Sequence, residues 1–220
     1  MSLTPEQLFA LLTKETWTTL YMTLFSTLFA YLLGLPLGVL LVVTEKNGLW
    51  PNRGIHWLLN VFVNILRSAP FLILMMTVMP ITRSIVGIAY GPKATIVALT
   101  ISAFPYVGRL VESSLKEVDP GVIEAMRSMG ARPMQIIRKA LLPEALPSLL
   151  TGATLATTTI LGYSAMAGAI GGGGLGAVAI NYGYYRYEYM VMILTLALLI
   201  LLVQIIQMLG NAWARTVDKR

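Results

Sequence analysis

The chain has 220 residues, of which 56% are hydrophobic and only 12% are charged, and its formal net charge is +6. A soluble domain of this length would carry roughly twice that share of charge. The sequence contains no cysteine, which excludes disulfide frameworks and thiolate metal sites. Its only histidine, His56, has no companions with the spacing of metal ligands, so we predict no metal site.

Five apolar segments are each long enough to cross a bilayer as a helix, which takes about 20 residues. In lipid, only helices and closed barrels give every backbone N–H and C=O group a hydrogen-bond partner. These segments lack the alternation of polar and apolar residues that barrel strands show. The predicted fold is therefore an all-α, polytopic membrane protein with one transmembrane domain over residues 1–220. The expected spans cover about 17–43, 57–82, 91–112, 145–170 and 188–213.

Arg67 and Arg109 lie near the ends of the second and third predicted spans. Ionisable residues in membrane segments are candidate functional sites, but arginines near an interface can extend into water or pair with a carboxylate. We favour the structural role, with Glu112 or Glu117 as the partner.

The long apolar run over 145–185 could also be read as two spans, but four consecutive glycines at 171–174 disfavour a continuous helix. We therefore expect 171–187 to form a loop or short surface helix on the outer side. Its tyrosines are typical of a membrane interface, and its glycines suggest a mobile gate.

The distribution of basic residues predicts the orientation of the chain. With the N-terminus outside and the C-terminus in the cytoplasm, ten cations fall on inner segments and four on outer segments, which matches the positive-inside rule. The inner cations are Lys46, Arg53, Lys116, Arg127, Arg132, Arg138, Lys139, Arg215, Lys219 and Arg220. The outer cations are Lys14, Arg83, Lys93 and Arg186. The positive charge thus indicates topology, and we expect no nucleic-acid partner.

The charged segment at 113–144 is predicted to be a cytoplasmic loop with its own helices. Asp119 and Pro120 are typical of a helix start, and Gly130 can adopt the left-handed conformation that ends a helix. Pro133 can then open a second helix. We expect a short helix, a sharp turn and a second helix that returns to the membrane.

Two uses fit this amphipathic segment. It can lie in the headgroup layer with its methionines in lipid, or dock into a groove of a cytoplasmic protein, because methionines adapt well to such grooves. Composition does not choose between them. The chain has no G-x-x-x-x-G-K-[ST] phosphate loop, so any ATP-driven work needs a partner ATPase.

The spacing of Glu124-Ala125, Gly130 and Leu142-Pro143 resembles the EAA loop of ABC-importer permeases. In that loop, E-A-A is followed after three residues by glycine and after nine more by I-x-L-P. Met126 stands at the second alanine and Ala140 at the isoleucine, and both are apolar residues compatible with a helix.

Longer stretches, 64–74, 109–147 and 161–184, resemble the permease subunits of methionine importers, which have the type I ABC-importer architecture. The resemblance implies a non-enzymatic permease in the bacterial inner membrane that imports an amino acid, in particular methionine. It implies a permease homodimer, two cytoplasmic ATPases that bind ATP and magnesium, and an extracytoplasmic substrate-binding lipoprotein.

The same resemblance implies that residues 120–134 form a coupling helix that sits in a groove of the ATPase. The candidate coupling residues are Glu124, Ala125, Met126, Gly130 and Pro143. We expect Pro143 to keep this segment separate from the fourth span.

Tyr163, Ser164 and Met166 place polar or polarizable groups in the fourth span, and they are candidates for lining the translocation path. Ordinary helix packing explains them equally well. The competing functions are import of another small substrate, a membrane scaffold without transport, and an intramembrane enzyme. An enzyme is disfavoured because the chain has neither cysteine nor an H-E-x-x-H motif.

Overall fold

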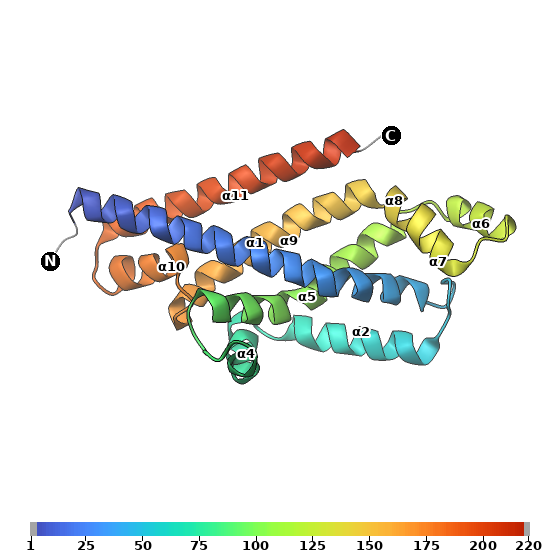
Figure 1. Ribbon diagram of the computed structural model, residues 1–220, viewed down its shortest axis with the longest axis horizontal. Coiled ribbons are helices and arrows are strands. Elements are labelled where there is room, and N and C mark those ends of the chain that lie inside the picture. The colour runs from blue at the N-terminus through green and yellow to red at the C-terminus, as the bar shows by residue number, and fades with distance from the viewer. Residues whose placement is uncertain (1–3, 218–220) are drawn as a thin grey trace. The chain divides into compact units, whose positions relative to one another are not determined.

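The computed structural model describes residues 4–217, and every regular element in that range is a helix (Figure 1). In chain order the elements are α1 (Pro5–Val43), α2 (Arg53–Ser68), α3 (Phe71–Thr77), α4 (Met79–Val86), α5 (Pro92–Lys116), α6 (Pro120–Ser128), α7 (Pro133–Ile136), the π-helix η1 (Ile137–Leu141), α8 (Leu142–Glu144), α9 (Leu146–Ala167), the 3-10 helix η2 (Gly168–Ile170), α10 (Gly174–Val178), the π-helix η3 (Ala179–Tyr184) and α11 (Tyr189–Val217).

Within residues 4–217, four helical segments are long and apolar enough to cross a membrane: α1, α5, α9 with η2, and α11. The pair α2 and α3 supplies a fifth if a broken helix pair counts as one span. This confirms the predicted all-α, polytopic class.

The second predicted span, 57–82, is not one helix, and this expectation was wrong. The helix α2 ends at Ser68, and Pro70 precedes the first residue of α3. Proline has no N–H to donate and restricts the residue before it to extended conformations. The chain therefore breaks here between α2 and α3, with a bend of 106°, and a second break at Val78 separates α3 from α4.

The structure divides into two compact units, each with its own core. Unit 1 consists of Ala69–Ala103, Thr157–Gln207 and the chain up to Phe29. Unit 2 consists of Ala30–Ser68, Phe104–Ala156 and the chain from Met208 onward.

The cations separate between these units in the same way as they do in the predicted topology. The four expected outer cations all belong to unit 1. Eight of the ten expected inner cations belong to unit 2, and the other two, Lys219 and Arg220, lie outside the described residues. The charge pattern that predicted the topology thus recurs in the division of the chain into two units.

In unit 1, a core of Leu161, Leu175 and Leu202 joins α9, α10 and α11. Gly176 makes this packing possible, because a β-carbon there would overlap the backbone of Ala165. This is a close helix contact of the kind that small residues allow.

We expect Gly176→Ala to destabilise the folded chain by about 1–3 kcal/mol, because overpacking forces the neighbouring backbone to shift. The matched control is Gly162→Ala, since a β-carbon at Gly162 in α9 has no neighbour within 4 Å. Alanine should be tolerated there, as it favours a helix interior over glycine. Thermal unfolding of both variants in detergent measures the difference, and equal midpoints would contradict the packing role of Gly176.

In unit 2, a core of Leu37, Leu41 and Val63 joins α1 to α2. Gly38 of α1 packs directly against α5, because a β-carbon there would lie 2.6 Å from atoms of Val111. The unit 2 portions of α1, α2 and α5 thus form one packed block.

Candidate functional site

The segment between α5 and α9 has the predicted local structure. The carboxylate of Asp119 accepts a hydrogen bond of 2.7 Å from the Gly121 N–H, which caps the start of α6. Gly130 has a φ of 75°, the left-handed conformation that ends the turn after α6. Pro133 opens α7. The expected helix, turn and returning helix are confirmed, and we call residues 120–134 the coupling segment.

The coupling segment has one face toward its own chain and one face open. Val122, Ile123 and Met126 are half-buried, and α6 packs against α7 and η1. The open side consists of Glu124, Ala125, Met129, Gly130 and Met134. It therefore carries both polar and apolar groups, and Met129 is 74% exposed.

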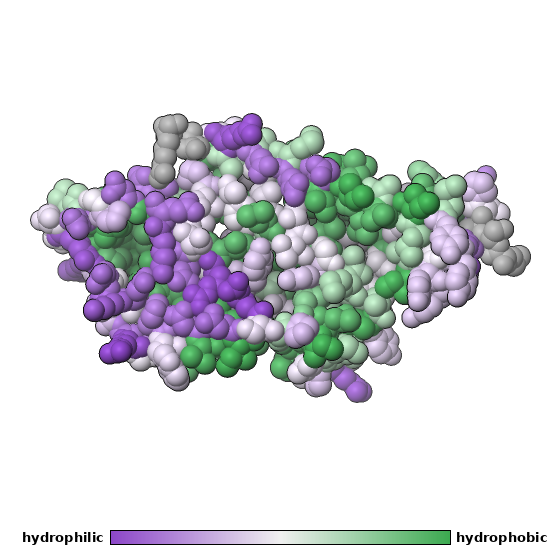
Figure 2. All heavy atoms as spheres, turned by 180° about the vertical axis from the view of Figure 1, so that it is seen from behind, coloured by the Kyte–Doolittle hydropathy of each residue, from purple (hydrophilic) through white to green (hydrophobic). Residues whose placement is uncertain are grey.

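Hydrophilic residues gather on the end of unit 2 that carries the coupling segment (Figure 2). An exposed methionine beside a glutamate and surrounded by hydrophilic residues is better suited to a protein groove than to lipid. The surface therefore favours docking over a position in the headgroup layer.

Pro143 does not separate the coupling segment from the fourth span, which corrects our expectation. The chain is helical from α7 through η1 and α8 and almost without interruption into α9. Proline cannot donate a hydrogen bond to the preceding turn, and the wider π-helical turn of η1, directly before α8, accommodates this loss. The returning helix is thus joined to α9 through η1, α8 and a single turn residue, Ala145, and the chain changes direction there (Figure 1).

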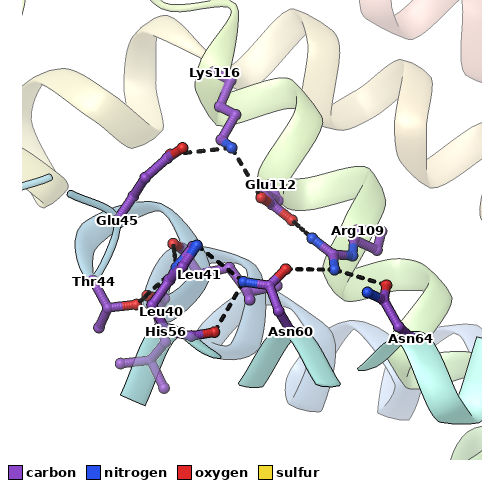
Figure 3. A network of polar contacts seen from close by, with 10 residues as sticks. All are labelled: Leu40, Leu41, Thr44, Glu45, His56, Asn60, Asn64, Arg109, Glu112 and Lys116. Atoms are coloured by element: carbon purple, nitrogen blue, oxygen red, sulfur yellow. Dashed lines mark hydrogen bonds and ion pairs between the residues drawn. The ribbon is translucent and has the colours of Figure 1, made fainter. Parts of the chain in front are cut away.

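Polar side chains connect α1, α2 and α5 in unit 2 (Figure 3). The carboxylate of Glu112, whose side chain is 8% exposed, pairs with Arg109 and lies 3.0 Å from the Lys116 ammonium. Arg109 also donates to the side-chain oxygens of Asn60 at 2.6 Å and Asn64 at 2.9 Å. The predicted pairing of Arg109 with a nearby carboxylate is confirmed.

This network extends to the end of α1. The Lys116 ammonium lies 3.1 Å from Glu45 as well as contacting Glu112. A nitrogen of His56 lies 3.1 Å from the Leu41 carbonyl oxygen, and its other nitrogen lies 3.0 Å from the Asn60 amide. His56 is therefore a structural residue of this network.

A second contact joins α6 to the loop between α1 and α2. The guanidinium of Arg127 donates to the Gly48 carbonyl at 2.9 Å. This contact was not predictable from the sequence, because the two residues lie 79 positions apart. The Glu112 and Lys116 pair, by contrast, has the four-residue helical spacing that indicates an ion pair.

The three candidate path residues in α9 differ in their surroundings. The ring of Tyr163 stacks on Phe71 with centroids 3.9 Å apart. Met166 is 47% exposed, whereas Ser164 is only 1% exposed and donates to the Leu161 carbonyl at 2.8 Å. Ser164 is thus buried within this chain, and its place on the path stays a prediction.

Two hydrogen bonds to α1 hold the start of α10 within the glycine-rich stretch of 171–187, and the mobile gate stays a prediction. The Gly174 N–H donates to the Glu15 carboxylate at 2.9 Å, and the Leu175 N–H donates to the Thr19 hydroxyl at 2.8 Å. These bonds fix the start of α10 to α1. Short helices, α10 and η3, form here as expected, but four of the five residues of α10 are buried, so it is not the surface helix that we predicted.

Comparison with known proteins identifies the family. Residues 32–220 match the binding-protein-dependent transport system inner membrane components. The chain belongs to this family. It is thus an inner membrane transport component, as the EAA-like loop of the coupling segment indicated.

Curated members of the family are similar over most of this transport component. It is 53% identical over 210 residues to a probable D-methionine transport system permease protein MetI of Vibrio cholerae, covering 96% of this chain and 93% of that one. It is 47% identical to the D-methionine transport system permease protein MetI of Escherichia coli, covering 74% and 75%. It is 44% identical to the methionine import system permease protein MetP of Bacillus subtilis, covering 93% and 92%.

Solved structures agree with this family assignment. A chain from inward-facing conformations of the MetNI methionine ABC transporter has a TM-score of 0.96 and 47% identity, with both chains covered completely. An amino acid ABC transporter crystallised with histidines has a TM-score of 0.79 at 21% identity, which shows the shared fold alone.

Proposed function

We propose that this chain is the transmembrane permease subunit of an ABC importer that brings methionine into the cytoplasm. The observation that carries the proposal is similarity over the whole chain to a subunit of a methionine transporter, at 47% identity and a TM-score of 0.96. Three relatives with methionine transport names, from Vibrio cholerae, Escherichia coli and Bacillus subtilis, support the same substrate. Residues 1–220 act as a single permease domain, with the N-terminus outside and the C-terminus in the cytoplasm.

The assembly that we propose contains two copies of this permease and two cytoplasmic ATPase subunits that bind ATP and magnesium. An extracytoplasmic binding lipoprotein delivers the amino acid. The permease itself supplies no energy, because hydrolysis occurs on the partner subunits.

The coupling segment transmits the movement of the ATPases. Glu124, Ala125 and Gly130 lie on its open side, and Met126 fixes α6 against the chain. When ATP brings the two ATPases together, each seated segment moves with its ATPase. Since the returning helix is joined to α9 through η1, α8 and Ala145, that movement passes into the fourth span.

We further propose that Met166 and Tyr163 of α9 line part of the path. Met166 presents its thioether on an open face, and sulfur is polarizable enough to contact a methionine side chain favourably. Tyr163 is held by its stack on Phe71, so its position depends on α3.

The proposal is tested by uptake of a panel of labelled amino acids into vesicles that contain the complete complex. We expect ATP-dependent accumulation of methionine in preference to leucine, histidine and glutamine. Accumulation of a different amino acid would overturn the substrate, and normal assembly without any uptake would favour a scaffold.

A further inference from the structure

Two cationic side chains hold the loop between α1 and α2, residues 44–52. Lys116 is the last residue of α5, and its ammonium lies 3.1 Å from Glu45. Arg127 belongs to α6, and its guanidinium donates to the Gly48 carbonyl at 2.9 Å. The loop is therefore joined both to the coupling segment and to the helix that precedes it.

The loop is folded firmly onto the end of α1. The Trp50 N–H donates to the Val43 carbonyl at 2.8 Å, and the Asn52 N–H donates to the Thr44 carbonyl at 3.0 Å. A β-carbon at Gly48 would overlap the Val43 carbonyl, so the loop packs against the end of α1 without a gap. A displacement of Glu45 or Gly48 is therefore passed on to α1.

The unit 2 part of α1 does not move alone. Gly38 packs without a gap on Val111 of α5. The buried Glu112 carboxylate holds Lys116 on one side and Arg109 on the other, and Arg109 binds two asparagines of α2 (Figure 3). A buried carboxylate needs its partners to offset the loss of water. The network thus keeps α1, α2 and α5 together as a block.

We propose that the α1–α2 loop is a second transmission element of the coupling segment, with Arg127 and Lys116 as its positioning residues. This inference rests on the proposed function. Without the two contacts, a displacement of α6 reaches the helical block through the short link from Lys116 to Pro120 and, less directly, through α9, which packs on α5 at Gly152. With them, α1 and α2 follow α6 directly, so the whole block tilts when the ATPases close.

The contacts of Lys116 and Arg127 with the loop are better suited to transmitting motion than to stabilising the fold. The side chains of Lys116 and Glu45 are 43% and 44% exposed, and such pairs add little to folding free energy. Arg109 still pairs with Glu112 when Lys116 is replaced, so removing the two cations should lower stability somewhat but leave a folded permease that assembles normally and transmits motion poorly.

The test is the double variant Lys116→Met, Arg127→Met in the complete reconstituted complex. We expect co-purification with the ATPase and the rate of ATP hydrolysis to stay near the parent values. Uptake per ATP hydrolysed should fall by about fivefold or more, the lower end of typical coupling between two sites. The conservative variant Lys116→Arg, Arg127→Lys, which keeps both donors, should restore the ratio.

The matched control is Lys46→Met, an exposed cation of the same loop that has no ion pair among residues 4–217. It should leave uptake per ATP unchanged. The inference is overturned if the double variant keeps the parent ratio, if uptake and hydrolysis fall in proportion, or if the ATPase no longer co-purifies.

A readout without any transported substrate separates this inference from the proposed function. The chain has no cysteine, so Trp50→Cys introduces a single, half-exposed thiol into the loop. Its labelling rate should change when a non-hydrolysable ATP analogue binds the complex, and the double variant should abolish that change. No nucleotide response in the parent would refute the transmission role, whereas failure of methionine uptake alone would refute only the proposed substrate.

Discussion

Replacing Gly130 with aspartate is expected to abolish uptake while the permease still folds and inserts. The left-handed backbone at Gly130 is accessible to aspartate at modest cost, and a β-carbon there meets no atom within 4 Å. The free chain therefore accepts the substitution. In the complex, however, the new carboxylate would be buried unpaired against the ATPase, which costs about 2–5 kcal/mol. Association should weaken by about 30-fold or more.

A matched control is available at Gly87, which ends α4. Gly87 has a φ of 77° and equally open space around its α-carbon, but it belongs to unit 1. Gly87→Asp should keep full association and uptake. Binding of the ATPase to both variants, measured in detergent by biolayer interferometry, gives the comparison. Parent-like binding by Gly130→Asp would contradict the docking role of the coupling segment.

Replacing Arg109 with leucine is expected to destabilise the permease by about 3 kcal/mol. The change removes the ion pair with Glu112 and two hydrogen bonds to asparagines of α2. Glu112 then keeps only Lys116, which is itself partly exposed. A buried charge that loses a partner is costly because nothing replaces its lost hydration.

The control for this prediction is Arg67→Leu. Arg67 is the exposed arginine in the last turn of α2, and the described part of the chain shows no ion pair for it. Leucine should be tolerated at that position. Unfolding of both variants in mixed micelles would measure the difference, and similar stabilities would show that the network in Figure 3 does not support the fold.

The sequence was most informative where local chemistry decides the structure. Asp119, Gly130 and Pro133 each impose a backbone conformation on their own turn, so the helix, turn and helix of the coupling segment were predictable. The helical spacing of Glu112 and Arg109 likewise indicated their pairing.

Features that depend on distant residues were missed or mistaken. The contact of Arg127 with Gly48 and the capping of Gly174 by Glu15 join positions 79 and 159 residues apart. Pro143 was expected to interrupt the helix, but a π-helical turn accommodates it. Ser164 lies on a buried face that periodicity alone did not distinguish from the open face of Met166.

The central claim is that the coupling segment faces the cytoplasm and is held by the ATPase. Because the chain lacks cysteine, Met129→Cys creates a unique thiol on the most exposed large hydrophobic residue of that segment. Tyr184 belongs to unit 1 and is 65% exposed. Tyr184→Cys therefore serves as the reference thiol for the outer side of the membrane. With a membrane-impermeant maleimide on intact cells, we expect labelling of the cysteine at position 184 only. In inverted vesicles we expect labelling at 129 only after the ATPase is stripped away, and labelling at 129 on intact cells would contradict the central claim.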